Sequence, residues 1–390
     1  MRLDMISPTV PDAQGTASGR ELLAWVEAAR ALGHEVRCWI WDVGMMAGRD
    51  IDIPSWCRVE LLPERARSGW REHLYSLRRP RWQVAEAGWR PEPGWVPYAD
   101  HPTSYPAVAG CAQAVTTFHY RALLDARAVG RYRPALVQDV RAELRAARGS
   151  AVSLCWSARV ARGLGRRATA VPVAYAAPAQ PQELTDEPVA AVLADWNWPP
   201  NQVAAKLLLD AWPQVREEVP AARLLMAGRS QERLGIGTVP GVTLLGEVPD
   251  SAEVLARASV LAFPCPSSSG TKIKVLEALA RGLPVVTTRY GVEGLRIGEG
   301  DVALAAPADY ARVLARVLAA PDKRAAMGAA GRRSVLEHHS PEASARARMA
   351  AIARGLGLPE EVPSPARSSG TGAAVGGTVA AGPGASEPAQ

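Results

Sequence analysis

The sequence contains no apolar run close to the ~20 residues that a membrane-spanning helix needs, so it does not predict a membrane-inserted protein. Its opening residues, MRLDMISPTV, hold one arginine and then an aspartate ahead of any apolar stretch. They therefore lack the basic and long apolar regions of a secretory signal. We expect a soluble protein of the cytoplasm, without stable membrane insertion.

Cysteine and histidine are too few and too scattered to suggest a disulfide framework or a metal centre. No two of the five cysteines are close in the sequence, and an odd number in a chain without an export signal favours reduced thiols. The histidines other than His119 have no partner at the spacing of metal ligands. We expect no metal site and no bound cofactor. The cysteines are Cys38, Cys57, Cys111, Cys155 and Cys265.

The charge distribution does not favour a nucleic-acid-binding protein. The net charge is +6, but the arginines are spread along helical stretches that also hold alanine and glutamate, and they do not cluster with aromatic residues. A genome that favours Arg, Ala, Gly and Pro codons accounts for the basic excess. We expect no nucleic-acid partner.

The first half of the 390-residue chain has the pattern of a parallel α/β sheet. An apolar strand, RLDMISP, leads through a Gly/Ser loop into an amphipathic helix, RELLAWVEAARALG, and the strand HEVRCWIW begins at once. In this order the crossover helix covers one face of a parallel sheet. Residues 61–106, rich in Trp, Arg and Pro, show no recognisable pattern. Further strands are expected at 113–120, 134–140, 152–156 and 170–175, and helices at 121–130 and 141–149.

The second half repeats this alternation after a proline-rich polar segment. Its strands are rich in Val and Leu without polar alternation, as in strands that helices bury on both faces. Ser340, Pro341 and Glu342 form a capped helix start. We predict an N-terminal Rossmann-like, acceptor-binding domain (1–178), a linker (179–188), a C-terminal Rossmann-like, nucleotide-sugar-binding domain (189–340), a final helix (341–358) and a disordered tail (359–390).

The stretch SSSGTKIKVLEALARGLPVV, residues 267–286, combines small residues, two lysines and one glutamate at a helix start. Small residues let the backbone approach a ligand, and the free N–H groups of a helix that begins near Thr271 point at the same place. With Lys272 and Lys274 this suits a diphosphate. Glu277 can accept hydrogen bonds from a vicinal diol such as a ribose. First-turn lysines are also common on solvated surfaces, so the pattern alone does not decide.

Three segments of the second half resemble retaining GT-B-fold glycosyltransferases of the GT4-like group, the glycosyl transferases group 1. They are GTKIKVLEALARGLPVVTTRYGVEGL, NWPPNQVAAKLLLDAWPQVREEVPAARLLMAGR and GVTLLGEVPDSAEVLARASVLAFPCP. The resemblance covers about residues 189–336, and the first half matches only in layout. It implies a GT-B architecture, two Rossmann-like doubly wound domains with an interdomain cleft. It also implies a nucleotide-diphosphate sugar as donor substrate.

The resemblance assigns roles to residues of the second half. Glu277 would hold the nucleotide ribose, Lys272 would act on the leaving diphosphate, and the loop after strand VTLLG would lie against the base. The residues that it places around the donor are Gly246, Glu247, Val248, Ser269, Gly270, Thr271, Lys272, Ile273, Lys274 and Glu277.

The chain departs from the family pattern at several of these places. Asp195 and Pro200 stand where the family has an arginine and a lysine, and Ser269 stands where many members have a first glutamate. We infer that Lys272 and Lys274 replace the two missing cations. Arg229 is a third candidate.

In the first half the resemblance points to Gly15, Gly19 and His119. The glycines lie in the first strand-to-helix loop, where the family has an adjacent pair near the donor phosphate and the acceptor, but their spacing is looser here. His119, at a strand end, matches a histidine that faces the reacting sugar in the family. Simple packing of His119 beside Phe118 and Tyr120 fits equally well, and both interpretations stay open.

Twelve tryptophans against two phenylalanines suggest stacking on sugars. Trp196 and Trp198 follow a strand whose end would face the cleft, so we expect them near the sugar. Trp25 and Trp212 lie at helical spacing among leucines and are predicted to belong to the core.

The hypothesis is a metal-independent transferase, a monomer or a homodimer, that moves a sugar with retention to a hydroxyl or amine of a small natural-product molecule. Alternatives are a transferase that acts on a cell-envelope polysaccharide or a lipid-linked glycan, and a catalytically silent nucleotide-sugar-binding subunit of an active enzyme. An epimerase or a phosphorylase of the same fold is a further alternative.

Overall fold

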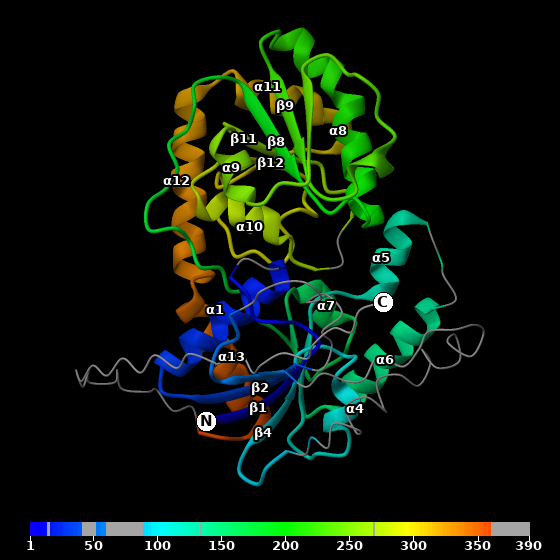
Figure 1. Cartoon of the computed structure of the whole chain (residues 1–390), viewed down its shortest axis with the longest axis vertical. Helices are drawn as coiled ribbons and strands as arrows, with labels where there is room; N and C mark the ends of the chain where they lie inside the picture. The colour runs from blue at the N-terminus through cyan, green and yellow to red at the C-terminus, as the bar shows by residue number, and fades with distance from the viewer. Residues whose placement is uncertain are drawn as a thin grey trace, which may run out of the picture.

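The computed structural model describes residues 1–13, 16–40, 52–59, 89, 91–130, 132, 135–267 and 270–359. Within them the chain forms two parallel sheets that are flanked by helices and stacked one above the other along the long axis (Figure 1). This is the predicted pair of Rossmann-like domains. The segment from Val171 to Pro188, which holds no helix or strand, connects them.

The first sheet places its topological switch point beside the cleft. Its strands follow the order β3-β2-β1-β4-β5-β6-β7, so the chain moves outward in one direction after β1 and in the other after β4. Ligands of doubly wound sheets bind outside the carboxyl ends at such a reversal. The strands are β1 (Arg2–Ser7), β2 (Glu35–Ile40), β3 (Cys57–Val59), β4 (Val96–Ala99), β5 (Val115–Phe118), β6 (Val152–Cys155) and β7 (Ala168–Ala170).

The second sheet also reverses its strand order once. Its order is β10-β9-β8-β11-β12-β13, with the reversal between β8 and β11. The strands are β8 (Val189–Leu193), β9 (Arg223–Ala227), β10 (Val242–Gly246), β11 (Val260–Phe263), β12 (Val285–Thr287) and β13 (Ala303–Leu304).

Helices flank both sheets, and those before β13 connect one strand to the next. In the first domain they are α1 (Ala17–Ala31), α4 (Tyr105–Val108), α5 (Ala122–Val129), α6 (Ala135–Gly149) and α7 (Ala158–Arg162). In the second they are α8 (Pro199–Glu218), α9 (Ser251–Ala256), α10 (Ile273–Ala280), α11 (Tyr310–Leu318), α12 (Pro321–His338) and two short 3₁₀ turns, η1 (Gln231–Leu234) and η2 (Pro307–Asp309).

Two strand predictions in the first half are wrong. Of the strand predicted at 134–140, residues 135–140 belong to α6, because Leu136, Val140 and Leu144 continue at a spacing of four residues, which is helical. The strand predicted at 170–175 contributes only Ala170 to β7. Pro172 lacks a backbone donor, and the segment after it leaves the sheet.

The last helix, α13 (Pro341–Leu356), returns to the first domain, as Figure 1 shows by its place beside α1. It starts as predicted, with the Ser340 hydroxyl accepting a hydrogen bond from the Ala343 N–H. Arg348 is fully buried there, lies over the ring of Trp25 and donates to the carboxylate of Glu21. The C-terminal helix therefore completes the core of the N-terminal domain.

The cores agree with the predicted roles of Trp25 and Trp212, which are fully buried in the first and second domain. Among the described helices, none has the length and apolar character that a membrane crossing requires. Most of the unpatterned segment, residues 61–88 and 90, and the predicted tail from residue 360 onward lie outside the described residues.

Candidate functional site

The carboxyl ends of the two sheets meet at a direct contact between the domains. Tyr120, just after β5, forms an antiparallel bridge with Gly270, in the loop after β11. The hydroxyl of Thr271 donates to the backbone oxygen of Trp156, 2.8 Å away, at the end of β6. Gly270 and Thr271 of the predicted donor-binding segment therefore lie directly against the residues that follow β5 and β6, close to His119.

Gly270 is needed for this close approach. A Cβ at this position would lie 2.3 Å from the carbonyl oxygen of His119, far inside van der Waals contact. Gly294, which follows β12, makes a similar approach, since its Cβ would lie 2.3 Å from the backbone oxygen of Trp156 in the first domain. These two glycines therefore allow the contact between the domains.

Helix α10 starts directly behind the loop. Lys272 is its N-cap residue, and the side chains of Thr271 and Ile273 are buried. Thr271 and Ile273 can therefore offer a ligand little beyond their backbone N–H groups. The first N–H groups of a helix are free of intrahelical partners and attract anions. This end of α10 fits the predicted diphosphate site.

Lys274 is half-buried in the first turn of α10. Its Nζ donates to Oδ1 of Asn201, 3.0 Å away, and lies 4.3 Å from the centre of the Phe263 ring. Burial, and then the charge of Lys272, lower the pKa of Lys274 to about 7. A bound anion would restore the charged form.

Glu277 is held firmly at the domain boundary. Its side chain is buried, and its Oε1 accepts a hydrogen bond of 2.7 Å from the hydroxyl of Ser251. Its Oε2 lies 3.4 Å from a guanidinium nitrogen of Arg20 in the first domain. Burial, and then the Glu277 carboxylate, raise the pKa of the neighbouring Tyr175. Its role toward a ribose stays a prediction.

The predicted base-binding loop leads to the same carboxylate. Gly246, with a left-handed φ of 70°, ends β10, and its N–H donates to Oε1 of Gln231 over 2.6 Å. Glu247 is exposed and Val248 is half-buried. Ser251, the partner of Glu277, follows three residues after Val248, so this loop and the Glu277 region are adjacent.

The end of β8 differs from the expectation in one residue. Trp196 is fully buried in the core of the second domain, so its predicted place near a sugar is wrong: the side chain points inward from the strand end. Trp198 is 44% exposed and its ring lies edge-on to that of Tyr120, 6.2 Å away. Arg229, the third candidate cation, lies 3.7 Å from the carboxylate of Asp195.

His119 combines the two interpretations that the sequence left open. Its buried ring stacks on Trp156, with the centroids 4.1 Å apart and the planes within 9°. Its Nε2 lies 3.7 Å from Oδ1 of Asp100, the residue that follows β4. Within the described residues, neither of these two buried atoms has a hydrogen-bond partner. The packing of His119 is therefore confirmed, and its role toward a sugar stays a prediction.

Gly19 has a local role in the structure. It lies in the first turn of α1, where its N–H donates to the hydroxyl of Thr16, and a Cβ would lie 2.4 Å from the carbonyl oxygen of Val10. It therefore lets the loop after β1 fold against the helix. Gly15 and Ser269 lie outside the described residues.

Sequence reasoning missed Arg20, Ser251, Asp100 and Trp156. Asp100 and Trp156 directly follow buried strands, β4 and β6, and this position is a signal that could have found them. Arg20 and Ser251 contact Glu277 from a different domain and a different helix, so only the fold reveals them. The described residues contain no group of three His, Cys, Asp or Glu side chains arranged to hold a metal ion.

The comparison with protein families agrees with this geometry. Residues 187–320, which include β8 to β13 and α10, match the model of the glycosyl transferases group 1. The match covers most of the second domain and about a third of the chain. Gly270, Lys272, Lys274 and Glu277 lie inside the matched segment.

Curated relatives match the chain over part of their length. One is a phosphatidyl-myo-inositol mannosyltransferase of Mycobacterium leprae, 32% identical over 120 residues, which cover 29% of this chain and 32% of the relative. Another is a GDP-mannose-dependent monoacylated alpha-(1-6)-phosphatidylinositol monomannoside mannosyltransferase of Corynebacterium glutamicum, 34% identical over 144 residues (33% of this chain, 38% of the relative). The matches thus span about a third of these relatives.

A solved structure extends the similarity to both domains. Sucrose-phosphate synthase from Thermosynechococcus elongatus superposes with a TM-score of 0.68 and 17% identity, over 91% of this chain and 99% of that one. At this identity the match shows the fold, which is the GT-B arrangement that the sequence predicted.

Proposed function

We propose that the chain is a glycosyltransferase that moves a sugar from a nucleotide-diphosphate sugar to a lipid-linked acceptor of the cell envelope. The observation that carries the proposal is the start of α10, where Lys272 and Lys274 stand beside the free N–H groups of the first turn and Glu277 is fixed by Ser251 one turn later. This arrangement lies inside the segment that matches the glycosyl transferases group 1.

The activities named for the two curated relatives support a lipid acceptor over the small natural-product molecule that the sequence suggested. Both act on phosphatidylinositol or its mannosides, and one of them is named as GDP-mannose-dependent. We therefore propose a nucleotide sugar as donor, with GDP-mannose tested first.

In the proposed reaction the bond between the sugar and the diphosphate breaks as the acceptor hydroxyl attacks. The negative charge that develops on the leaving diphosphate would be stabilised by the α10 N–H groups and by the two lysines, which are fixed before the reaction starts. Charged lysine side chains meet this need without a divalent cation, so we propose a metal-independent transfer.

Retention of the anomeric configuration is part of the proposal. The acceptor would attack on the face that the diphosphate leaves, and a phosphate oxygen would take the proton of the acceptor hydroxyl. His119, whose Nε2 is buried beside the cleft, would contact the sugar. The contact between Tyr120 and Gly270 would close the cleft and exclude water.

A transfer assay tests the proposal. The purified chain is given GDP-mannose, UDP-glucose or ADP-glucose with phosphatidylinositol in detergent, and label in the lipid fraction is measured with and without EDTA. We expect transfer from one donor, insensitive to EDTA, and its loss in the Lys272→Ala, Lys274→Ala double variant. Nuclear magnetic resonance of the product gives the anomeric configuration.

The assay also separates the alternatives. A chain that binds the donor but transfers no sugar to phosphatidylinositol or to polysaccharide acceptors would be a silent binding subunit. Sugar found on small alcohols and absent from lipids would return the proposal to the natural-product acceptor.

The cysteines of the described residues are all free thiols, which agrees with a reducing compartment such as the cytoplasm.

A further inference from the structure

One face of α6 is basic and exposed. Val137, Arg141, Leu144, Arg145 and Arg148 recur at helical spacing on the same side of the helix, and we call these five residues the α6 basic face. All except the half-buried Leu144 are exposed, and Val137 is 53% exposed. Both acidic residues of the helix, Asp139 and Glu143, fall outside this face.

The charges of the α6 basic face have no partner among the described carboxylates. Glu143, the nearest acid in the sequence, is buried on the opposite side and binds Arg121, with 2.7 Å between Oε2 and Nε. Three guanidinium groups therefore point to solvent within three turns of one helix. Such an uncompensated field attracts a polyanionic partner.

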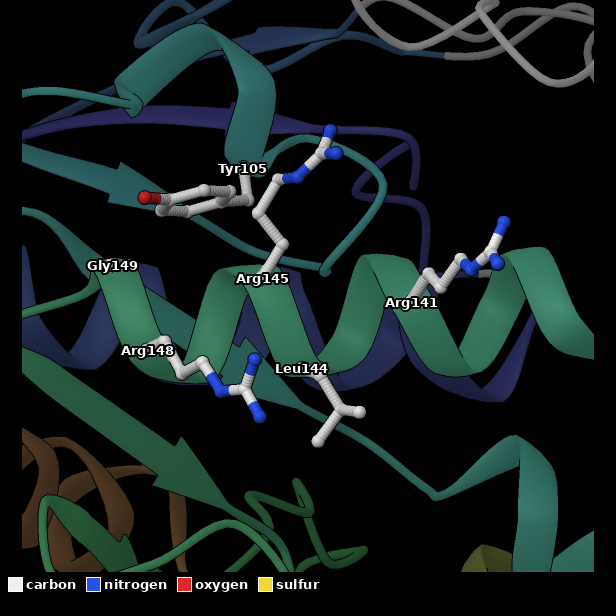
Figure 2. Close-up of a pocket in the computed structure, with 6 residues that line it drawn as sticks. All are labelled: Tyr105, Arg141, Leu144, Arg145, Arg148 and Gly149. Atoms are coloured by element: carbon white, nitrogen blue, oxygen red, sulfur yellow. The ribbon is translucent and has the colours of Figure 1, made fainter.

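A cavity of about 480 Å³ opens at the C-terminal end of this face. It is lined by Tyr105 of α4 and by the helix, and Figure 2 shows the stem of Arg145 beside Tyr105, with the guanidinium directed away from the ring. Its volume lies in the range of small-molecule sites, large enough for a phosphate with an attached polyol. Gly149 leaves room for Tyr105, because a Cβ there would overlap the tyrosine hydroxyl.

The buried side of α6 is hydrogen-bonded to the segment between β5 and α5. Glu143 accepts hydrogen bonds of 2.7 Å from the backbone N–H of Ala122 and from Arg121, two residues after His119. These bonds hold the start of α5 and the residues that follow β5 against α6. Hydrogen bonds therefore connect α6 to the segment that directly follows His119.

We propose that the α6 basic face docks the chain on a bilayer that contains anionic phospholipids. The arginines complement the lipid phosphates, and the cavity beside Tyr105 accepts one headgroup. Val137 and Leu144, aliphatic residues among the charges, suit the boundary between headgroups and acyl chains and have no use on a nucleic-acid backbone. The inference rests on the proposed function in one respect, that a lipid-linked acceptor is reached at a membrane surface.

Vesicle sedimentation of the full chain tests this inference. We expect binding to vesicles of phosphatidylcholine mixed with phosphatidylinositol, none to phosphatidylcholine alone, and release at high salt. The Arg141→Gln, Arg145→Gln, Arg148→Gln variant should lose roughly 100-fold in partitioning, since each arginine near an anionic surface contributes several-fold. The matched control, Arg257→Gln, Arg316→Gln, Arg333→Gln, removes three exposed arginines of the second domain and should bind as the wild type does.

Several results would overturn the inference. They are failure of the wild-type chain to bind anionic vesicles, binding that salt does not weaken, equal partitioning of the α6 variant and the control, and binding of duplex DNA in place of vesicles. The salt series uses the wild-type chain, so its result remains valid even if a variant misfolds. Nucleotide binding and transfer in detergent are measured separately, so a wild-type chain that transfers sugar in detergent but does not bind anionic vesicles rejects the docking surface alone. Docking without transfer rejects the proposed function alone.

Discussion

Arg20 of the first domain lies 3.4 Å from the carboxylate of Glu277 in the second. The other oxygen of Glu277 is held by Ser251 of its own domain over 2.7 Å. The contacts with Ser251 and with Arg281, 3.9 Å away, are therefore independent of the domain arrangement, and the contact with Arg20 exists only where the domains meet. Under the proposed function, Glu277 would link nucleotide binding to the contact between the domains.

Replacing Glu277 by alanine should weaken the binding of a nucleoside diphosphate by about 10- to 100-fold, because hydrogen bonds to a charged group contribute ~1.5–3 kcal/mol. Isothermal calorimetry measures this loss. Glu253→Ala, an exposed glutamate of α9, is the control and should leave affinity unchanged. If Glu277→Ala binds as tightly as the wild type, the ribose assignment is wrong.

The elements of the second domain could be predicted because its strands are short, apolar and bounded by turn residues. The predicted start of α13 was correct for a similar reason: Ser340 and Pro341 are local capping signals. The errors arose where a local signal was ambiguous. Residues 134–140 are a short apolar run that suits a strand, and only the later leucine shows the helical period.

The site was partly predictable for a comparable reason. Lys272, Lys274 and Glu277 lie within one short motif, so their proximity follows from helix geometry. Arg20 and Asp100 come close to Glu277 and His119 only through the packing of distant elements. Trp196 was misplaced because the sequence does not show on which side of a strand end the chain turns.

Gly270→Ala should separate the domains at their contact. The new methyl group would lie 2.3 Å from the His119 carbonyl oxygen, which is backbone and has little freedom to move. We expect a loss of ~1–3 kcal/mol in the stability of the closed arrangement and a larger radius of gyration by small-angle scattering. Gly237→Ala, where the methyl would meet nothing, is the matched control. Identical scattering of both variants would contradict the assignment of Gly270 to closure.

Arg348→Met should destabilise the first domain by ~3–5 kcal/mol, because it leaves the buried carboxylate of Glu21 without its charged partner. Urea unfolding measures the difference. Replacing both residues, Arg348→Met with Glu21→Leu, should recover most of the loss, since no buried charge then remains. Arg346→Met, on the exposed side of the same helix, should change stability by less than ~1 kcal/mol. A double variant as unstable as the single one would refute this account.

Binding of a nucleotide sugar should depend on the protonation of Lys274. Burial lowers the pKa of this lysine to about 7, and a bound diphosphate would raise it by favouring the charged form. Affinity is therefore full below pH 7 and falls as the pH rises through the free and toward the bound pKa, by at most about tenfold per pH unit. A nucleotide sugar is the right ligand, because its diphosphate has no proton to lose in this range. Lys274→Arg stays charged and should bind with no such pH dependence. A wild-type affinity that is flat from about pH 6 to about pH 9 would show that Lys274 does not meet the diphosphate.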